Sequence, residues 1–295
     1  MRVLIVGCGY VGLSLGKELA RQGHDVSGLR RSALAAAEMQ AAGLTPLHAD
    51  ITQPETLARL PRQFDWVVNC SASGGGDAAD YREIYLEGNR NLLAWLADAP
   101  PKKFIYTSST SVYAQNDGSV VTEQSPAEPD AATAKVLVET EKFLLAAAQE
   151  KKFPSVILRV AGIYGPGRGR LFKQFLRGAA KIEGNGARFL NMIHRDDLIG
   201  VIIAALEKGT PGEIYNAVDD EPVTQLNFFR WLAETLKKEL PPFAPEEISR
   251  KRGVTSKRVS NVKLRAELNY AFRFPDFRAG YAAEIGRLAA QDFPV

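Results

Sequence analysis

The chain opens with Met1-Arg-Val-Leu-Ile-Val-Gly-Cys-Gly-Tyr-Val-Gly12, and this stretch decides the fold. An apolar, β-branched run stops at the pattern G-x-G-x-x-G, and a segment with helical periodicity follows. This order is typical of a dinucleotide site, where the amino end of the helix holds the pyrophosphate. We expect Gly7 to permit the turn, Gly9 to let the backbone approach the phosphates, and Gly12 to let helix pack on strand. The cofactor-binding residues expected in this loop are Gly7, Gly9, Tyr10, Val11 and Gly12.

The bulk composition excludes several classes of function. The 295 residues are 45% hydrophobic, enough to bury a large core. The formal net charge is +3 with both signs interspersed, so we expect neither nucleic-acid binding nor attachment to a membrane. The two cysteines, Cys8 and Cys70, fall at expected strand ends as reduced thiols, which is typical of a cytoplasmic protein. The histidines His24, His48 and His194 lack the spacing of metal ligands, so we expect no metal site.

Strand-like and helix-like segments alternate through the first half of the chain. This rhythm predicts an α/β fold built on a doubly wound parallel sheet of the Rossmann kind. The expected strands are Val3–Val6, Asp25–Leu29, Leu44–His48, Trp66–Cys70, Phe104–Ser108 and Ser155–Val160. The expected helices are Tyr10–Gln22, Ser32–Ala42, Glu55–Leu60, Tyr81–Asp98 and Ala131–Glu150. Because the carboxyl ends of parallel strands share one edge of the sheet, we expect the ligand along that edge.

The character of the sequence changes after Gly165. A loop, a short helix and a hairpin are expected in turn over Gly165–Arg170, Leu171–Ala180 and around Gly184-Asn-Gly186, before Ile214–Ala217 returns to the main sheet. Further expected features are helices at Asn227–Glu239 and Phe277–Leu288, a turn at Pro241–Pro245 and a basic stretch at Arg250–Arg258. We therefore expect a dinucleotide-binding domain over 1–165 plus about 191–220. A smaller C-terminal substrate-binding appendage takes 166–190 and 221–295.

The end of the second expected strand indicates which dinucleotide is bound. Such sites usually place an acidic residue there, whereas this strand ends in Arg30 and Arg31, followed by Ser32. Two guanidinium groups suit a 2′-phosphate, which a carboxylate would repel. We expect NADP(H), with NAD(H) less favoured; the alternative is a solvated arginine pair. Asp50, after the third strand, either accepts a hydrogen bond from the adenine amino group or caps the helix after Thr52.

Several later stretches carry a resemblance to a known family. They are Phe104–Tyr113, a serine-bearing strand with an aromatic after it, Leu158–Gly167, and Ile193–Leu198. Together with the glycine loop they resemble extended, atypical short-chain dehydrogenases/reductases of the NAD-dependent epimerase/dehydratase family. The resemblance spans nearly the whole chain. It implies a nicotinamide cofactor beside a small polar or nucleotide-sugar substrate.

The family's chemistry uses four side chains, and the resemblance carries two of them over. Ser109 aligns with the serine that hydrogen-bonds the substrate oxygen, and Lys135 with the lysine of Y-x-x-x-K, which holds the nicotinamide ribose. The tyrosine of that motif falls on Ala131, which has no proton to transfer, and Tyr85 replaces the asparagine. Taken without the resemblance, Ser109 is a strand-end hydroxyl bonded to backbone, and Lys135 is an exposed helix lysine supported by Glu139.

Other polar residues are candidates for the remaining parts. Tyr85 is a candidate replacement acid if its helix follows the family's course; the alternative is packing in the core or an interface. The resemblance implies that Tyr164 lines the cofactor mouth and that Arg168 and Arg188 grip an acidic leaving group, the alternative being a solvated basic loop. Tyr113 is expected to pack under the loop after Ser109.

Two classes of function remain open. One is an NADP(H)-dependent oxidoreductase or epimerase/dehydratase on a small polar or nucleotide-sugar substrate. The other is a non-catalytic NADP(H)-binding or redox-sensing protein, which the alanine at position 131 favours. The resemblance also implies a homodimer, packed through the helices that carry Tyr85 and Lys135.

Overall fold

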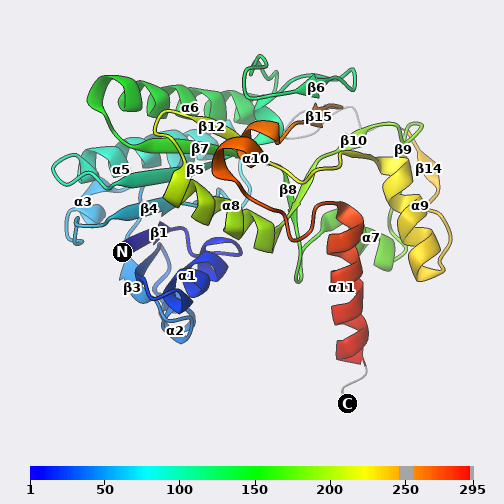
Figure 1. Cartoon of the computed structure of the whole chain (residues 1–295), viewed down its shortest axis with the longest axis horizontal. Coiled ribbons are helices and arrows are strands. Elements are labelled where there is room, and N and C mark those ends of the chain that lie inside the picture. Colours follow the sequence, from blue (N-terminus) through cyan, green and yellow to red (C-terminus); the bar gives the residue numbers. More distant parts are fainter. Residues whose placement is uncertain (246–254, 293–295) are drawn as a thin grey trace.

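A parallel sheet of seven strands forms the centre of the molecule, in the order β12-β7-β5-β4-β1-β2-β3 (Figure 1). The computed structural model describes residues 1–245 and 255–292. The strands are β1 (Arg2–Val6), β2 (Asp25–Arg30), β3 (Thr45–His48), β4 (Trp66–Asn69), β5 (Lys103–Ser109), β7 (Ser155–Val160) and β12 (Ile214–Ala217). The doubly wound Rossmann sheet is confirmed, and each of its strands lies within one residue of the expected bounds.

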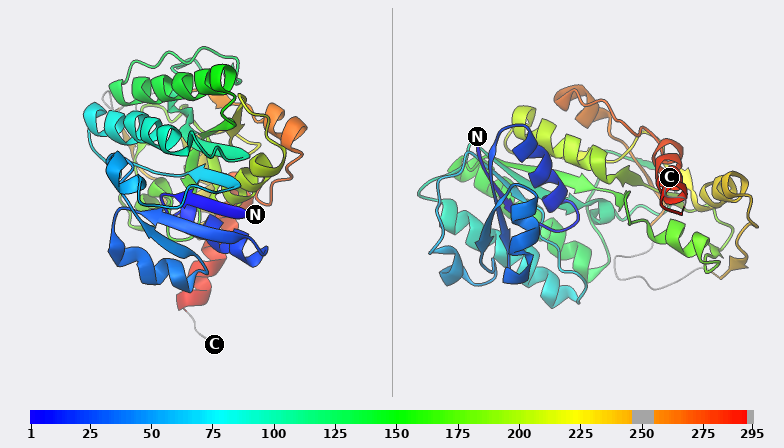
Figure 2. Two further views of the ribbon diagram at one scale, coloured as in Figure 1. Left: turned by 90° about the vertical axis from the view of Figure 1, so that its left-hand side faces the viewer. Right: turned by 90° about the horizontal axis from the view of Figure 1, so that it is seen from below.

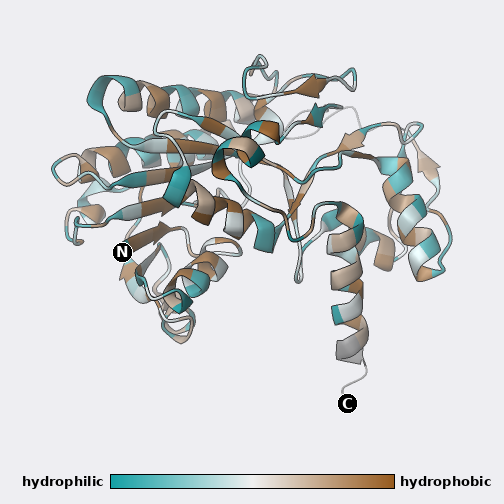
Figure 3. Cartoon of the chain, viewed as in Figure 1, coloured by the Kyte–Doolittle hydropathy of each residue, from teal (hydrophilic) through white to brown (hydrophobic). Residues whose placement is uncertain are grey.

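Helices cover both faces of this sheet, and its central strands β1, β4 and β7 accordingly bury nearly every residue rather than every second one. One face carries α1 (Gly12–Arg21), η1 (Ala33–Ala35), α2 (Ala36–Ala41) and α8 (Arg195–Lys208), and the other α3 (Pro54–Leu57), α5 (Gly88–Leu96) and α6 (Ala132–Lys151) (Figure 2). In Figure 3 the central strands are mostly hydrophobic, whereas the surrounding helices carry both kinds of residue. The four residues Val3 to Val6 have no exposed surface.

The helix expected over Tyr81–Asp98 consists of three helical segments of two kinds, α and π. α4 (Ala78–Tyr81) leads into a π-helix, η2 (Arg82–Glu87), before α5 begins. The Asn89 side-chain amide donates to the Tyr85 carbonyl at 2.6 Å and so occupies an acceptor that a backbone N–H would use in a regular helix. Insertions of this kind widen a helix locally and are frequent at functional sites.

A second hydrophobic cluster lies beyond the carboxyl edge of the sheet, on the right of Figure 1. Its aromatic residues include Tyr164, Phe172, Phe175, Phe228, Phe229, Phe277 and Tyr281. The elements that carry or flank it are α7 (Arg170–Leu176), β9 (Ile182–Glu183), β10 (Phe189–Leu190), β13 (Val223–Thr224), α9 (Gln225–Leu236), β14 (Phe243–Ala244) and α11 (Phe277–Asp292).

Short strand pairs and one helix connect the two clusters. β8 (Gly162–Tyr164) pairs with β11 (Met192–His194), and β6 (Val120–Val121) pairs with β15 (Arg258–Val259). α10 (Val262–Leu268) packs against α8 and β12, so this part of the predicted appendage lies on the main sheet. A single 3₁₀ turn, η3 (Thr110–Val112), follows β5.

The prediction of a hairpin around Gly184-Asn-Gly186 is wrong. β9, before the glycines, pairs in parallel with β14, and β10, after them, pairs antiparallel with β13. The partner of β9 thus comes from Pro241–Pro245, which was expected to be a turn only. Most of the basic stretch Arg250–Arg258 lies outside the described residues. Within the described ranges, no helix is long and apolar enough to cross a membrane.

Candidate functional site

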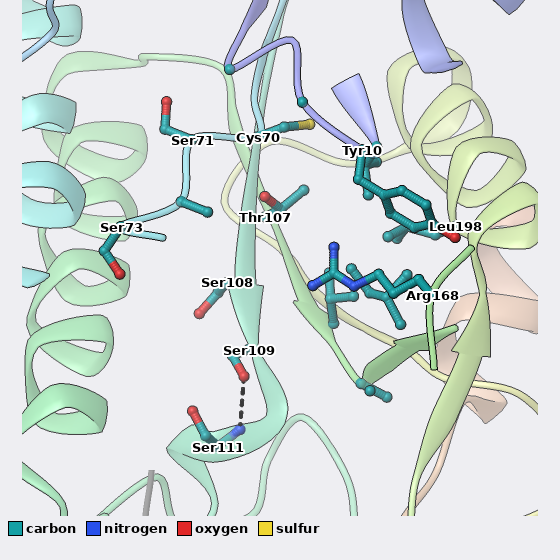
Figure 4. Close-up of a pocket in the computed structure, with 18 of the residues that line it drawn as sticks. Tyr10, Cys70, Ser71, Ser73, Thr107, Ser108, Ser109, Ser111, Arg168 and Leu198 are labelled. Carbon is teal, nitrogen blue, oxygen red and sulfur yellow. Dashed lines mark hydrogen bonds between the residues drawn. The ribbon is translucent and has the colours of Figure 1, made fainter. Parts of the chain in front are cut away.

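One cavity of about 1120 Å³ opens at the carboxyl ends of the parallel strands, between the two hydrophobic clusters. The glycine loop after β1, the ends of β2, β4 and β5, and the loop after β8 all line it. Figure 4 shows hydroxyls along β5 on one side and Arg168 reaching in from the other. The site therefore lies at the sheet edge that the alternation of strands and helices predicts.

The three glycines of the loop have different surroundings: Gly7 and Gly12 are closely packed, whereas Gly9 borders open space. Gly7 has φ +89°, and a Cβ there would lie 2.7 Å from the amide nitrogen of Ser71. A Cβ on Gly12 would lie 2.4 Å from the Gly7 carbonyl oxygen. By contrast, no atom lies within 4 Å of a Cβ built on Gly9, which faces the cavity. This free space above the start of α1 suits a phosphate group approaching the backbone.

Tyr10 and Val11 complete this side of the cavity. Val11 caps α1, and the Tyr10 ring lies between two guanidinium groups, 5.0 Å from that of Arg168 and 5.3 Å from that of Arg195. Burial raises the pKa of Tyr10. Its buried hydroxyl has no hydrogen-bond partner among residues 1–245 and 255–292. The hydroxyl is therefore enclosed by protein, although Tyr10 as a residue lines the cavity.

Arg30 and Arg31 lie at the cavity with only loose partners. Arg30 is 3.7 Å from the Glu38 carboxylate, and Arg31 is 3.9 Å from that of Asp50. Both separations exceed hydrogen-bond distance, so these guanidinium groups keep donors for a phosphate. Asp50 Oδ1 accepts hydrogen bonds from the Thr52 amide and hydroxyl in the turn before α3, whose N-cap is Gln53, so Asp50 does not cap that helix, and it also lines the cavity.

Ser109 stands at the end of β5 and lines the cavity. Its hydroxyl oxygen accepts a hydrogen bond from the Ser111 amide at 3.2 Å, drawn dashed in Figure 4. This bond caps η3, as expected for a strand-end serine, and leaves the Ser109 O–H free to donate to a ligand. Ser111 also lines the cavity.

A buried polar network supports this wall from behind. Arg159 pairs with Glu141 at 2.7 Å, with both side chains almost fully buried. Glu141 accepts a hydrogen bond from the Ser108 hydroxyl, and Arg159 donates to the Tyr113 hydroxyl. Burial disfavours the Arg159 charge, but the Glu141 carboxylate outweighs it and raises the pKa of Arg159. Tyr113 is thus fixed beneath the loop after Ser109, as expected.

The structure places Lys135 outside this cavity. Its side chain is exposed and borders a separate hollow together with Glu139 and Lys142. Leu137 lines the cavity instead, and Thr133, one helical turn before it, is buried. Since successive helix residues are about 100° apart, positions 135 and 137 face nearly opposite sides of α6. The structure therefore places Leu137, and not Lys135, in the cavity wall, so the predicted contact of Lys135 with a nicotinamide ribose stays a prediction that this placement does not support.

Tyr85 lines the cavity from η2 and is 7% exposed. Its ring centroid lies 4.9 Å from that of Tyr81, and its hydroxyl accepts a hydrogen bond from the Ser73 amide at 3.3 Å. Lys135, the cation expected beside it, lies on the other side of α6 and pairs with nothing in this wall. A role for Tyr85 as replacement acid stays a prediction.

The three residues expected at the substrate end all line the cavity, in different ways. Arg168 is exposed and points its guanidinium toward the hydroxyls of β5 (Figure 4). Arg188 lies 3.8 Å from the Glu183 carboxylate. Tyr164 stacks on Tyr281 at 4.3 Å and turns its hydroxyl away, to the Asp276 carbonyl oxygen. Tyr164 therefore offers its ring, and not its hydroxyl, to a ligand.

Two further residues of the wall were missed by the sequence reasoning. Lys257 and Asn191 line the cavity, and Lys257 is buried although it belongs to the basic stretch. Composition gives no signal for such a lysine, because a run of basic residues is ordinarily solvated. Its placement follows from pairing between β15 and β6, two strands of two residues each.

Both cysteines lie close to the cofactor side of the cavity. Cys8 is buried within the glycine loop, Cys70 ends β4 at the cavity wall, and both thiols are free. Burial raises the pKa of each thiol to about 12. Both are therefore neutral thiols at neutral pH.

Comparison with known proteins agrees with this geometry. Residues 3–217 match the sequence profile of the NAD dependent epimerase/dehydratase family. Protein YeeZ of Escherichia coli K12 is 31% identical, covering 93% of this chain and 97% of that protein. The structure of a putative NAD-dependent epimerase/dehydratase from Methylobacillus flagellatus is 33% identical with a TM-score of 0.79, covering 98% of both chains. UDP-glucuronic acid 4-epimerase from Bacillus cereus, in complex with UDP-glucuronic acid and NAD, shares the fold with a TM-score of 0.84 at 23% identity, covering 99% of this chain and 100% of its own. The chain belongs to the NAD dependent epimerase/dehydratase family.

Proposed function

We propose that this protein binds NADP(H) and catalyses a reaction of oxidoreductase or epimerase/dehydratase type on a small polar or nucleotide-sugar substrate. The observation that carries the proposal is a single cavity of about 1120 Å³ that joins the glycine loop, Ser109 and the Arg168 loop. An ordinary ligand site measures roughly 300–1,000 Å³, so this cavity has room for a cofactor and a second molecule together.

The residues at one end fit a phosphorylated dinucleotide. Gly9 leaves open space over the start of α1 for the pyrophosphate. Arg30 and Arg31 support NADP(H) over the NAD that the Bacillus cereus epimerase binds, because their carboxylate partners lie beyond hydrogen-bond distance. Asp50 is the remaining candidate in this half, toward the adenine.

The other end fits a polar substrate with an anionic part. Bound nicotinamide supplies or accepts a hydride. Ser109 would donate its O–H to the substrate oxygen, since its acceptor side is already used by Ser111. Arg168 and Arg188 would bind phosphate or carboxylate groups, and the Tyr164 ring would wall off water.

A second function has an observation in its favour. The two α6 positions that share one side of the helix at the Y-x-x-x-K spacing, Thr133 and Leu137, carry no ionisable group. A non-catalytic NADP(H)-binding or redox-sensing protein would need none. Its signature is a difference in affinity between NADP⁺ and NADPH without turnover.

The two functions are separated by binding and single-turnover measurements on the same protein. NADPH at about 100 times its Kd should stabilise the fold by about 2.7 kcal/mol, and Arg30→Ala or Arg31→Ala should weaken NADPH roughly 10-fold or more while changing NADH little. Absorbance of NADPH is then followed after mixing with carbonyl compounds and with UDP- and dTDP-sugars. Oxidation of the cofactor supports catalysis. Tight binding with no redox change across the panel supports the sensing function, and equal affinity of NADPH and NADH refutes the assignment of the arginines.

A further inference from the structure

Lys257 is a buried lysine in the wall of the cavity, next to η3. Its side chain is 4% exposed. Nζ donates to the Tyr113 carbonyl oxygen and to the Thr255 hydroxyl, each at 2.8 Å. An ammonium has three N–H donors, so one remains beyond these two bonds. Since Lys257 lines the cavity, a ligand there lies within reach of this group.

The chain holds Lys257 in place from both sides. Asn191 clamps its backbone, donating to the Lys257 carbonyl at 2.9 Å and accepting from the Val259 amide at 2.8 Å. On the opposite side β15 pairs with β6, and the Ser256 carbonyl accepts from the Gly118 amide at 2.8 Å. A long side chain that is fixed at its backbone and at its head group costs little further entropy when it binds a ligand.

The charged groups around Lys257 are occupied elsewhere. Arg258, the next residue and the first of β15, donates to the Gly118 carbonyl and lies over the Phe189 ring. Arg188, on the segment facing it, is near Glu183, and the Tyr113 hydroxyl on the η3 side is bonded to Arg159 and Asn216. Burial lowers the pKa of Lys257 to about 8, and no charged group contributes to this shift. The amine is therefore protonated at neutral pH and releases its proton readily.

Two hydroxyls share this wall with Lys257. The Lys257 head group is bonded to the Tyr113 carbonyl, and the single turn η3 connects Tyr113 to Ser109. Ser109 and Ser111 line the same cavity as Lys257. This part of the wall therefore offers a ligand oxygen both an ammonium and a serine O–H donor.

We propose that Lys257 is the proton donor and acceptor of this site, acting on a substrate oxygen bound along the cavity wall that carries Ser109 and Ser111. The inference rests on the proposed function. It assigns the acid–base role to the C-terminal segment that carries Lys257, because α6 places no ionisable side chain at the cavity. Leu137 and Thr133 carry no ionisable group, and Lys135 faces away.

The proton balance of the step is simple. In a reduction, the substrate carbonyl carbon accepts a hydride from the reduced nicotinamide dinucleotide, and its oxygen accepts a proton from Lys257 Nζ. The C=O π bond breaks, and one C–H and one O–H bond form. Lys257 is left as a neutral amine that regains a proton from water. The oxidation runs the same step in reverse, with neutral Lys257 as the base.

The first test measures Lys257 directly and needs no turnover. The wild-type protein is labelled with trace acetic anhydride across a pH series, and acetylation at each lysine is quantified by mass spectrometry. We expect Lys257 to become reactive with a midpoint near pH 8, about two units below the reference value of about 10.4 for a solvated lysine. A Lys257 that does not react, or that becomes reactive only near the reference value, overturns the proposal.

The second test uses substitutions. Lys257→Met and Lys257→Arg, the latter keeping the charge but not releasing a proton, should both lower the single-turnover rate about 10²–10⁴-fold while NADPH affinity stays within about twofold. Lys142→Met is the matched control on a lysine far from the cavity. A wild-type rate in Lys257→Arg with folding intact overturns the proposal. If the wild type binds NADPH but turns over no substrate, the catalytic function fails, and the labelling midpoint alone decides the state of Lys257.

Discussion

Gly9→Val and Gly12→Val form a matched pair that separates cofactor binding from folding. A Cβ on Gly12 would lie 2.4 Å from the Gly7 carbonyl oxygen and 3.1 Å from Ile5 Cγ2. The carbonyl cannot retreat, because Gly7 is itself packed against Ser71. Overpacking costs about 1–3 kcal/mol, and contact with backbone places Gly12→Val near the upper end, at about 2–3 kcal/mol.

This cost translates into a measurable shift in melting temperature. Unfolding entropy is about 2.1 cal/mol/K per residue, which over 295 residues is about 0.6 kcal/mol/K. Gly12→Val should therefore melt roughly 3–5 °C below the wild type. Gly9→Val should melt within about 1 °C of it, because no atom lies within 4 Å of the new Cβ.

The affinity for NADPH should change in the variant whose stability does not: Gly9→Val should bind NADPH weakly although it melts like the wild type. The Gly9→Val side chain fills the space through which a pyrophosphate would approach α1, and loss of one hydrogen bond to a charged group weakens Kd roughly 10- to 150-fold. Calorimetric titration with NADPH measures the affinity, and thermal unfolding without ligand measures the stability. Wild-type affinity in Gly9→Val, or wild-type melting in Gly12→Val, would refute the reasoning.

Three other substitutions test separate parts of the structure. Lys135→Met should leave the NADPH Kd within about twofold of wild type, because the exposed side chain lies outside the cavity. A tenfold loss of NADPH affinity, measured by calorimetry, would show that Lys135 contacts the cofactor after all. Glu141→Gln leaves the Arg159 charge buried without its carboxylate and should cost about 3–5 kcal/mol in urea unfolding, and a cost under about 1 kcal/mol would contradict the structure. Burial lowers the pKa of His194 more than its hydrogen bond to Glu284 raises it, so the unfolded state binds more protons and stability should fall as pH drops below about 6.5. His194→Gln should flatten that fall in urea unfolding across the same pH series, and an equal slope in both proteins would count against it.

The main sheet is predictable because its signals are local. A central strand such as β1 is an apolar run that ends at a turn, and burial on both faces makes the run continuous rather than alternating. The glycine loop is predictable for the same reason: strand, glycines and helix are adjacent in sequence. The site edge then follows from parallel connectivity alone.

The helix phase at Lys135 is not a local property. Val136 and Leu137 are both buried. The pattern of apolar residues on α6 therefore does not decide which side of the helix faces the cavity. The choice is made by packing against β5, β7 and η2, which lie far away in sequence. An alignment of Y-x-x-x-K by residue type chose the lysine, and the fold presents Leu137.

The remaining misses are also pairings over long sequence distances. β9 pairs with β14 rather than across its own glycine turn, and β15 brings Lys257 to β6 from the other end of the chain. Strands of two residues have no detectable periodicity, so nothing in the sequence distinguishes them from loop. Burial of a lysine within a basic stretch is decided by such pairings.

The state of the two cysteines has a practical consequence for following this protein in motion. Alkylating reagents attack thiolates, and a thiol of pKa about 12 is almost entirely unreactive at neutral pH. An exposed cysteine introduced by Arg168→Cys would have an ordinary pKa near 8.5 and would take up a maleimide fluorophore selectively. Neither Cys8 nor Cys70 therefore has to be removed before labelling. A fluorophore at position 168 would report any movement of the Gly165–Arg170 loop at the cavity.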